Sequence, residues 1–154
     1  MSIELDHFFI LTKEAASQAD QLLDFGIIEG ASKKHSGQGT ANRRFFLNNT
    51  CLEFLYVCDE NEALNGPGKG LRLLERSSNV NASPFGLVMK TVPNTHDVPF
   101  VGWKYCPDYF ESDQCFHVGS NSDAIEEPLC IVMPENLPQA KNLSCTRESG
   151  LAAH

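Results

Sequence analysis

The stretch 35–57 constrains the fold most, because a carboxylate stands in the middle of an apolar, strand-like run. Two such runs lie on either side of a pair of asparagines, which predicts a β-hairpin. Glu53 lies in the middle of the second run. A carboxylate is rarely buried unless a cation or hydrogen-bond donors compensate its charge. We therefore expect Glu53 to contact either a bound metal ion or one of the arginines Arg43 and Arg44 on the neighbouring strand.

The N-terminal part predicts a strand followed by a helix. Residues 3–11 alternate in polarity up to Asp6, and His7 shares one face of this strand with Leu5 and Phe9. Apolar residues then recur at helical spacing between a potential N-cap at Thr12 and a potential C-terminal glycine, Gly26. This strand and helix are the strongest local prediction in the chain.

The rest of the chain predicts shorter strands that prolines and polar loops separate. The expected strands are 27–35, 43–47, 52–57, 85–91, 100–105, 115–118 and 129–133. The polar segment 59–81 is expected to be a connection with one short helical turn, able to close over a site as a lid. Residues 139–154 show no clear period.

Composition narrows the class of protein. The chain has 154 residues, a net charge of −8 and 42% apolar residues, which suits one compact domain with a real core. An acidic chain without basic clusters is a poor partner for nucleic acid or an anionic membrane. No apolar run is long enough to cross a bilayer. The six cysteines form no C-x-x-C pair and no secretion signal precedes them, so we expect all six to be reduced and the protein to be cytoplasmic.

Four short stretches resemble a known family. Leu5-Asp6-His7-Phe8-Phe9 followed by an amphipathic helix, and Leu52-Glu53-Phe54-Leu55 on a later strand, are similar to the first βαβββ module of the glyoxalase-like, or vicinal oxygen chelate, superfamily. The run from His35 through Gly37-Gln38-Gly39-Thr40-Ala41-Asn42-Arg43-Arg44 resembles a glyoxalase-like subgroup of bacterial proteins, as does Ser83-Pro84-Phe85-Gly86.

The resemblance implies an α+β fold of the glyoxalase/bleomycin resistance/dioxygenase type, in which βαβββ modules form a curved mixed sheet around a cup. The single domain would then comprise a first module over 1–58, a connection over 59–82 and a partial or degenerate second module over 83–154. Many members of the superfamily hold a divalent metal with a histidine and a glutamate from each module. His7 and Glu53 match the first pair, and the second module has no matching histidine.

These considerations give a set of candidate site residues. His7 and Glu53 are the candidate catalytic pair and the candidate metal ligands, whether for Zn, Fe, Mn or Ni. His7 also has a plainer interpretation, as a histidine of the core. Since Arg43 and Arg44 alternate, one of them faces the cup, and we choose Arg43 as the substrate anchor. The other candidate substrate-binding residues are Gln38, Thr40, Asn42 and Trp103.

Three functions are compatible with this pattern. The first is a glyoxalase-like enzyme of the lyase or isomerase kind, or a dioxygenase-like one, that uses a divalent metal or direct proton transfer. The second is a metal-free protein that binds or sequesters a small molecule in the same cup. The third is a degenerate domain that only dimerises. A small-molecule ligand and a homodimer are the expected partners, since one module with a broken second half leaves sheet edges uncovered.

Overall fold

The computed structural model describes residues 3–92, 98–111, 113–135 and 137, and residues 139–154 lie outside this range. Its strands and helices follow the order β1 (Ile3–Thr12), η1 (Glu14–Ala19), α1 (Asp20–Asp24), β2 (Lys33–His35), β3 (Thr40–Phe46), β4 (Cys51–Val57), α2 (Glu60–Asn65), η2 (Lys69–Leu71), α3 (Leu73–Ser78), β5 (Phe85–Thr91), β6 (Gly102–Tyr105), β7 (Phe116–Gly119), η3 (Ser120–Asp123) and β8 (Leu129–Val132).

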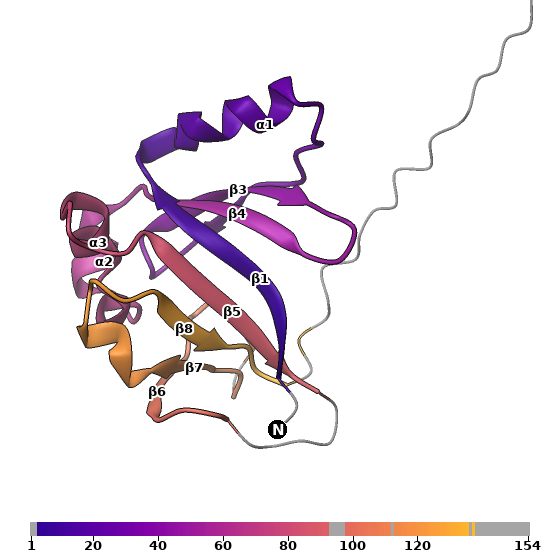
Figure 1. Ribbon diagram of the computed structural model, residues 1–154. Coiled ribbons are helices and arrows are strands. Elements are labelled where there is room, and N and C mark those ends of the chain that lie inside the picture. The colour runs from indigo at the N-terminus through magenta and orange to yellow at the C-terminus, as the bar shows by residue number, and fades with distance from the viewer. Residues whose placement is uncertain (1–2, 93–97, 112, 136, 138–154) are drawn as a thin grey trace, which may run out of the picture.

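The strands form one mixed, curled sheet in the order β2-β3-β4-β1-β5-β8-β7-β6 (Figure 1). Each half of the sheet has its first strand parallel to its last, β1 with β4 and β5 with β8. The halves join where β1 and β5 run antiparallel. The predicted α+β fold with a curved mixed sheet is thus confirmed. The predicted strand 85–91 coincides with β5, and the weakest prediction, 27–35, shrinks to the three residues of β2.

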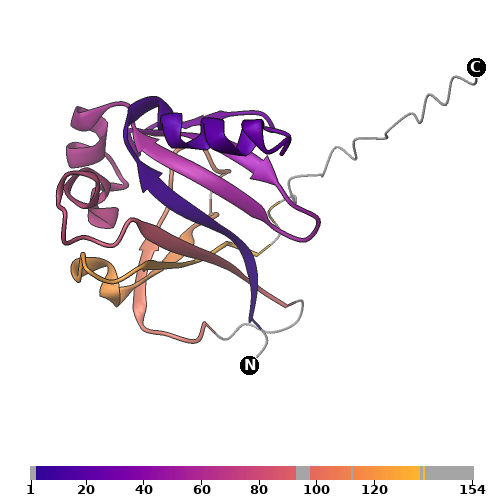
Figure 2. The ribbon, with the colours of Figure 1, turned by 45° about the horizontal axis from the view of Figure 1, so that its top comes forward.

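Helix α1 lies over the outer face of β3 and β4, as Figure 2 shows from above. Ala16 and Ala19 of η1, which precedes α1, are buried there against Phe45 of β3 and Phe54 of β4. The helix departs from the prediction at its start, because Lys13 rather than Thr12 is the N-cap. Within the first turn Ala16 has a left-handed φ of 47°, so a 3-10 segment and a short α-helix replace one continuous helix. That kink turns the two small alanines onto the sheet.

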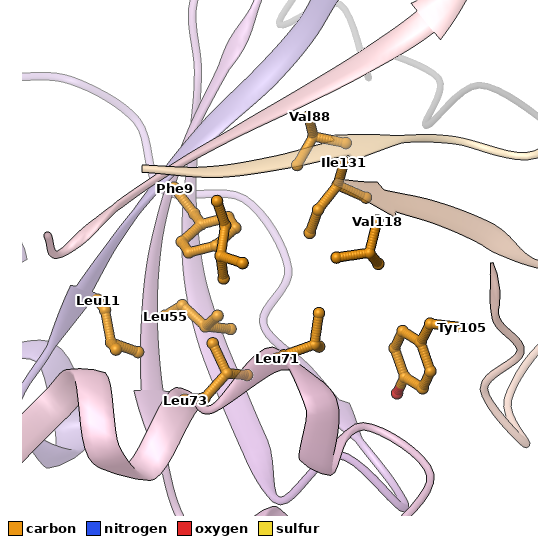
Figure 3. Close-up of a cluster of buried hydrophobic side chains, with 10 residues drawn as sticks. Phe9, Leu11, Leu55, Leu71, Leu73, Val88, Tyr105, Val118 and Ile131 are labelled. Atoms are coloured by element: carbon orange, nitrogen blue, oxygen red, sulfur yellow. The ribbon is translucent and has the colours of Figure 1, made fainter. Parts of the chain in front are cut away.

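The main core lies on the concave side of the sheet. Figure 3 shows side chains from β1, β4, β5, β6, β7 and β8 converging there with two leucines, Leu71 and Leu73, that follow α2. Close packing explains one residue of the Ser-Pro-Phe-Gly stretch. A Cβ on Gly86 would lie 2.1 Å from the ring of Phe9 on the neighbouring strand, so only glycine fits at this position.

The two halves are covered differently. In the first half, η1 and α1 follow β1, whereas no helix lies between β5 and β6 in the described part of that segment. The outer face of β5 therefore leaves Phe85 and Leu87 49% and 39% exposed. The connection between the halves holds α2, η2 and α3 where we predicted one helical turn. These helices lie at one end of the sheet (Figure 1) and place Leu71 and Leu73 against the core.

A disulfide joins Cys106 and Cys115, so the expectation that all six cysteines are reduced is wrong for this pair. The bond closes the loop between β6 and β7. No sequence motif predicts that these two cysteines pair. Cys51, Cys58 and Cys130 are free thiols, and Cys145 lies outside the described residues. The cytoplasmic location stays a prediction.

No helix in the described part of the chain has the length and apolar character needed to cross a membrane.

Candidate functional site

The concave side of the sheet holds a cavity of about 650 Å³, which we call the cup. This volume suits a small-molecule ligand. Its two sides differ in chemistry. The polar wall comes from the first half of the sheet and consists of Asp6, His7, His35, Gln38, Asn42 and Glu53. The apolar wall comes from the second half and the connection, and consists of Leu71, Leu73, Val88, Leu129, Ile131 and Met133.

Glu53 is the buried carboxylate of the polar wall, with only 7% of its surface exposed. Asn42 on β3 donates a 2.5 Å hydrogen bond from Nδ2 to Oε1, and His7 Nε2 lies 3.3 Å from Oε2. Burial raises the pKa of Glu53, but the contacts with His7, the charge of His35 and the amide of Asn42 outweigh it and lower that pKa overall. Glu53 is therefore an ionised carboxylate at neutral pH.

His7 stands between two carboxylates. Its Nδ1 lies 2.7 Å from Oδ2 of Asp6, on the side away from Glu53. Burial alone would lower the pKa of His7, yet the contacts with Asp6 and Glu53 raise it to about 9. At neutral pH His7 is thus an imidazolium that donates a hydrogen bond to Asp6 and forms an ion pair with Glu53.

A local irregularity brings Asp6 and His7 to the same side. The β1–β5 ladder shifts register between Leu5 and His7, as a β-bulge does. Strict alternation along β1 would point Asp6 to the outer face. Because of the shift, both side chains line the cup.

His35 approaches Glu53 from the other flank, with Nε2 4.0 Å from Oε1. The tight turn between β2 and β3 positions it, since Gly37 and Gly39 both take positive φ values, of 79° and 74°. The turn sets His35 opposite Thr40, whose Oγ1 is 3.0 Å from Nδ1. Burial lowers the pKa of His35, so this imidazole is neutral at pH 7.

Behind His35 lies a chain of buried hydrogen bonds. Gln38 donates from Nε2 to Thr40 Oγ1 at 2.8 Å. Its Oε1 accepts from the hydroxyls of Tyr105 at 3.1 Å and Tyr109 at 3.3 Å. Burial raises the pKa of Tyr105 to about 12 and also raises that of Tyr109, so both phenols keep their protons.

The two arginines take opposite faces of β3, as alternation predicts, but the choice between them needs correction. Arg43 is on the outer face, where its guanidinium binds Glu29 at 2.7 and 2.8 Å and Asp20 at 2.8 Å. It cannot anchor a ligand in the cup. Arg44 lines the cup instead and donates to the carbonyl of Ala31. The alternative of an ion pair between Glu53 and an arginine is therefore wrong, and His7 supplies the compensating charge.

Of the other candidate substrate-binding residues, two line the cup and two do not. Gln38 and Asn42 line the cup, and Asn42 binds Glu53 directly. Thr40 is fully buried behind them and contacts Gln38 and His35. Trp103 is not among the residues that line the cup. Its ring packs against Gly70 and its Nε1 donates to Ser122 at 3.0 Å, so its place in the structure is in the core.

The donor set for a metal differs from the one that the resemblance implies. Among the described residues there is no group of three or more His, Cys, Asp or Glu side chains placed to hold a metal ion. His7 and Glu53 contact each other directly. The residues of β5 and β8 that line the cup are Val88, Lys90, Thr91, Leu129 and Ile131, and none of them is a histidine, cysteine, aspartate or glutamate. These residues do not fit the four-ligand metal site of a two-module protein, and we derive no step through a metal.

Reasoning from the sequence missed three residues of the polar side of the cup. Strict alternation assigns Asp6 to the outer face, because the sequence pattern does not reveal the β-bulge that turns its side chain into the cup. His35 marks the start of a loop in the sequence, although the Gly37 and Gly39 spacing is a signal for a tight turn that would pair it with Thr40. Tyr109 lies on the disulfide-closed loop, and no local pattern predicts that this loop turns back to the cup.

No protein-family model matches the sequence, and no curated protein matches it either. Solved structures do match the fold. A hypothetical protein from Bacillus halodurans C-125 has 11% identity and a TM-score of 0.56, with 92% of this chain and 100% of that chain covered. Methylmalonyl-CoA epimerase from Mycobacterium tuberculosis has 12% identity and a TM-score of 0.51, with 84% and 85% covered.

A hypothetical protein from Staphylococcus aureus has 14% identity and a TM-score of 0.50 over 86% of this chain. This chain spans 59% of the length of that protein. At these identities the likeness establishes the fold alone. The fold that this chain shares with these structures agrees with the predicted α+β fold and its curved mixed sheet.

Proposed function

We propose that this protein is a small-molecule enzyme of the vicinal oxygen chelate superfamily that transfers a proton at a carbon beside a carbonyl group. The observation that carries the proposal is the placement of Glu53. Its ionised carboxylate lies on the wall of a cup large enough for a ligand, held between an imidazolium, His7, and an amide, Asn42. A buried carboxylate in a ligand-sized cavity is a candidate general base.

The step is simple to balance. Glu53 takes the proton from the carbon beside the carbonyl, and the electrons of the broken C–H bond form a C=C bond while the carbonyl oxygen becomes an enolate. Returning the proton to the same or the other face gives exchange or inversion. His7 keeps Glu53 ionised before the step and Asp6 keeps His7 protonated. The name of one neighbour in fold, an epimerase, is compatible with this class of reaction.

The test measures exchange rather than a particular product, because the substrate is not identified. The protein is incubated in D₂O with ketones, 2-oxo acids and acyl thioesters, and NMR follows replacement of hydrogen by deuterium beside the carbonyl. We expect exchange with at least one class, and loss of about 100-fold or more in Glu53→Gln, the usual worth of a general base. Glu126→Gln, at an exposed position outside the cup, is the matched control.

A second candidate is metal-free binding of a small molecule, and one observation favours it. The lowered pKa of Glu53 makes this carboxylate a weak base, which suits a hydrogen-bond acceptor better than a proton acceptor. This candidate expects ligand binding without any exchange. Divalent metal content should also be measured in the purified wild type and in His7→Ala. Near-stoichiometric metal in the wild type that is lost in the variant would overturn both metal-free mechanisms.

We also propose that the chain forms a homodimer, as the incomplete modules suggested. The support is the uncovered outer face of β5 with Phe85 and Leu87, together with the edges of the described sheet at β2 and β6. Sedimentation velocity tests this, and a monomer at every concentration would contradict it.

A further inference from the structure

One hydrogen-bond donor of the polar wall has no partner in the part of the protein that the structure describes. Among the described residues, Nε2 of His35 makes no hydrogen bond, since its nearest carboxylate oxygen, Oε1 of Glu53, is 4.0 Å away and already accepts from Asn42. His35 lines the cup. An N–H group at this atom is therefore available to a ligand.

The hydrogen bonds behind His35 fix which ring nitrogen carries the proton. Oε1 of Gln38 accepts from two phenols, so its Nε2 is the donor to Thr40 Oγ1. Thr40 is fully buried, and its hydroxyl hydrogen needs an acceptor. The acceptor that the structure offers is Nδ1 of His35, at 3.0 Å. The proton of the neutral ring is then on Nε2, on the cup side.

The opposite side of the cup indicates what the rest of the ligand is. Val88, Leu129 and Ile131 on β5 and β8 carry no polar side-chain atom and face the cavity. Leu71 and Leu73 extend this surface from the connection. Burying apolar ligand surface there contributes about 25 cal/mol per Å². A ligand with a bulky hydrocarbon group is favoured over a sugar or a nucleotide.

The rim adds positive charge on the same side as His35. Lys33 lines the cup with its ammonium 4.9 Å from the centre of the Tyr109 ring, and Arg44 lines it two strand positions from Asn42. A carboxylate on the ligand would find a partner here. Arg44 is also the cross-strand neighbour of Glu53, so an anionic ligand held by these cations would lie on the same side of the cup as that carboxylate.

We propose that the cup binds 2-oxo acids and related carbonyl compounds with a bulky apolar group, with the carbonyl oxygen accepting a hydrogen bond from Nε2 of His35 and the apolar group on Val88, Leu129 and Ile131. This places the carbon beside the carbonyl near Glu53. The inference rests on the proposed function for the chemical step after binding, but not for binding itself. During proton removal the same N–H would stabilise the enolate oxygen.

The test uses two probes that differ in one oxygen, 2-oxo-4-phenylbutanoate and 4-phenylbutanoate, with affinities measured by isothermal titration calorimetry. The wild type is expected to prefer the 2-oxo probe by about 5- to 10-fold, the worth of one hydrogen bond. His35→Gln places an amide N–H near the position of Nε2 and keeps most of the preference. His35→Asn places it near Nδ1 and loses the preference. His117→Asn, outside the cup, is the matched histidine control.

A second readout follows the proton itself. Nitrogen-15 NMR of the wild type should show the Nε2–H form of the His35 ring. Thr40→Val removes the hydroxyl that donates to Nδ1, so the fraction of Nδ1–H ring should rise and the preference for the 2-oxo probe should fall. A preference that survives in His35→Asn would overturn the proposal, and so would equal affinity for both probes or no binding of either to the wild type.

The two proposals can fail separately. If wild type prefers the 2-oxo probe but exchanges no deuterium into it, the carbonyl site stands and proton transfer by Glu53 falls. If exchange depends on Glu53 while His35→Asn leaves both affinity and exchange unchanged, the reaction stands and the role of His35 falls.

Discussion

The Nε2 atom of His7 lies 3.3 Å from Oε2 of Glu53, and the two residues come from the adjacent parallel strands β1 and β4. This contact explains how a carboxylate can stand in an apolar strand. An imidazolium compensates the charge, and Asp6 in turn holds the imidazolium. Stability, its pH dependence and ligand binding should all depend on this arrangement and on the fold that builds it.

The pH dependence of stability should have its maximum near pH 6.5. His7 has a folded pKa of about 9 against an ordinary value of 6.5, so its contribution is complete below pH 6.5 and is lost as pH rises toward 9. His35, Asp6 and Glu53 have lowered pKa values, so their contributions are lost as pH falls. Urea unfolding from pH 4 to 9 measures the curve. In His7→Gln the fall between pH 6.5 and 9 should largely disappear, and an unchanged slope would count against the ion pair.

Asn42→Asp keeps the shape of the side chain but sets a second carboxyl against Glu53. The lost N–H donor and the added charge should lower the free energy of unfolding by about 2–3 kcal/mol at pH 7. Below pH 5 the two carboxyls can share a proton, so the loss should shrink. The variant Asn61→Asp, on the exposed side of α2, serves as control. A loss that does not depend on pH would contradict the charge argument.

The two arginines should separate stability from binding. Arg43→Met removes the partner of Glu29 and Asp20 on the outer face, and we expect a loss of about 1–3 kcal/mol in stability with no effect on ligand binding. Arg44→Met should weaken binding of 2-oxo-4-phenylbutanoate with a smaller loss of stability. Calorimetry and urea unfolding of both variants give the comparison. Weakened binding in Arg43→Met alone would reverse this assignment.

The disulfide should support the wall of the cup as well as the fold. Cys106 and Cys115 close a loop that contributes Tyr109 and Phe110 to the cup. Replacing both cysteines by serine should cost about 2–4 kcal/mol of stability. It should also weaken ligand binding, because the loop holds Tyr109, whose hydroxyl donates to Gln38 in the wall of the cup. Thiol titration of the unfolded protein counts the free cysteines first. A full set of reactive thiols before any reductant is added would show that the bond does not form.

The sequence predicted most of the fold because local patterns carry it. Alternation of polar and apolar residues predicted strands β1, β3, β4 and β5. Gly26, which has a φ of 79°, marked the end of the first helix. What it could not predict comes from contacts distant in sequence. The kink at Ala16 lets Ala16 and Ala19 pack against the outer face of β3 and β4. The antiparallel pairing of β1 with β5 decides how the two halves of the sheet join.

The site was predicted in part, for a related reason. His7 and Glu53 were predicted to face the cup, and the parallel pairing of β1 with β4 does place them on one face. Asn42 was a candidate only as part of the loop, and the register of β3 against β4 places it beside Glu53. Asp6 depends on a bulge, which alternation does not reveal. The choice between Arg43 and Arg44 needed the exact register of β3 against β4, and a shift of one residue exchanges their faces.

Titration of the His7 ring by NMR tests the central claim most directly. We expect a midpoint near pH 9 in the wild type and a fall toward the ordinary value of 6.5 in Glu53→Gln, where the negative partner is gone but the amide has nearly the same shape. A wild-type midpoint at or below 6.5, or one that Glu53→Gln does not move, would contradict the pairing of these two residues in the cup.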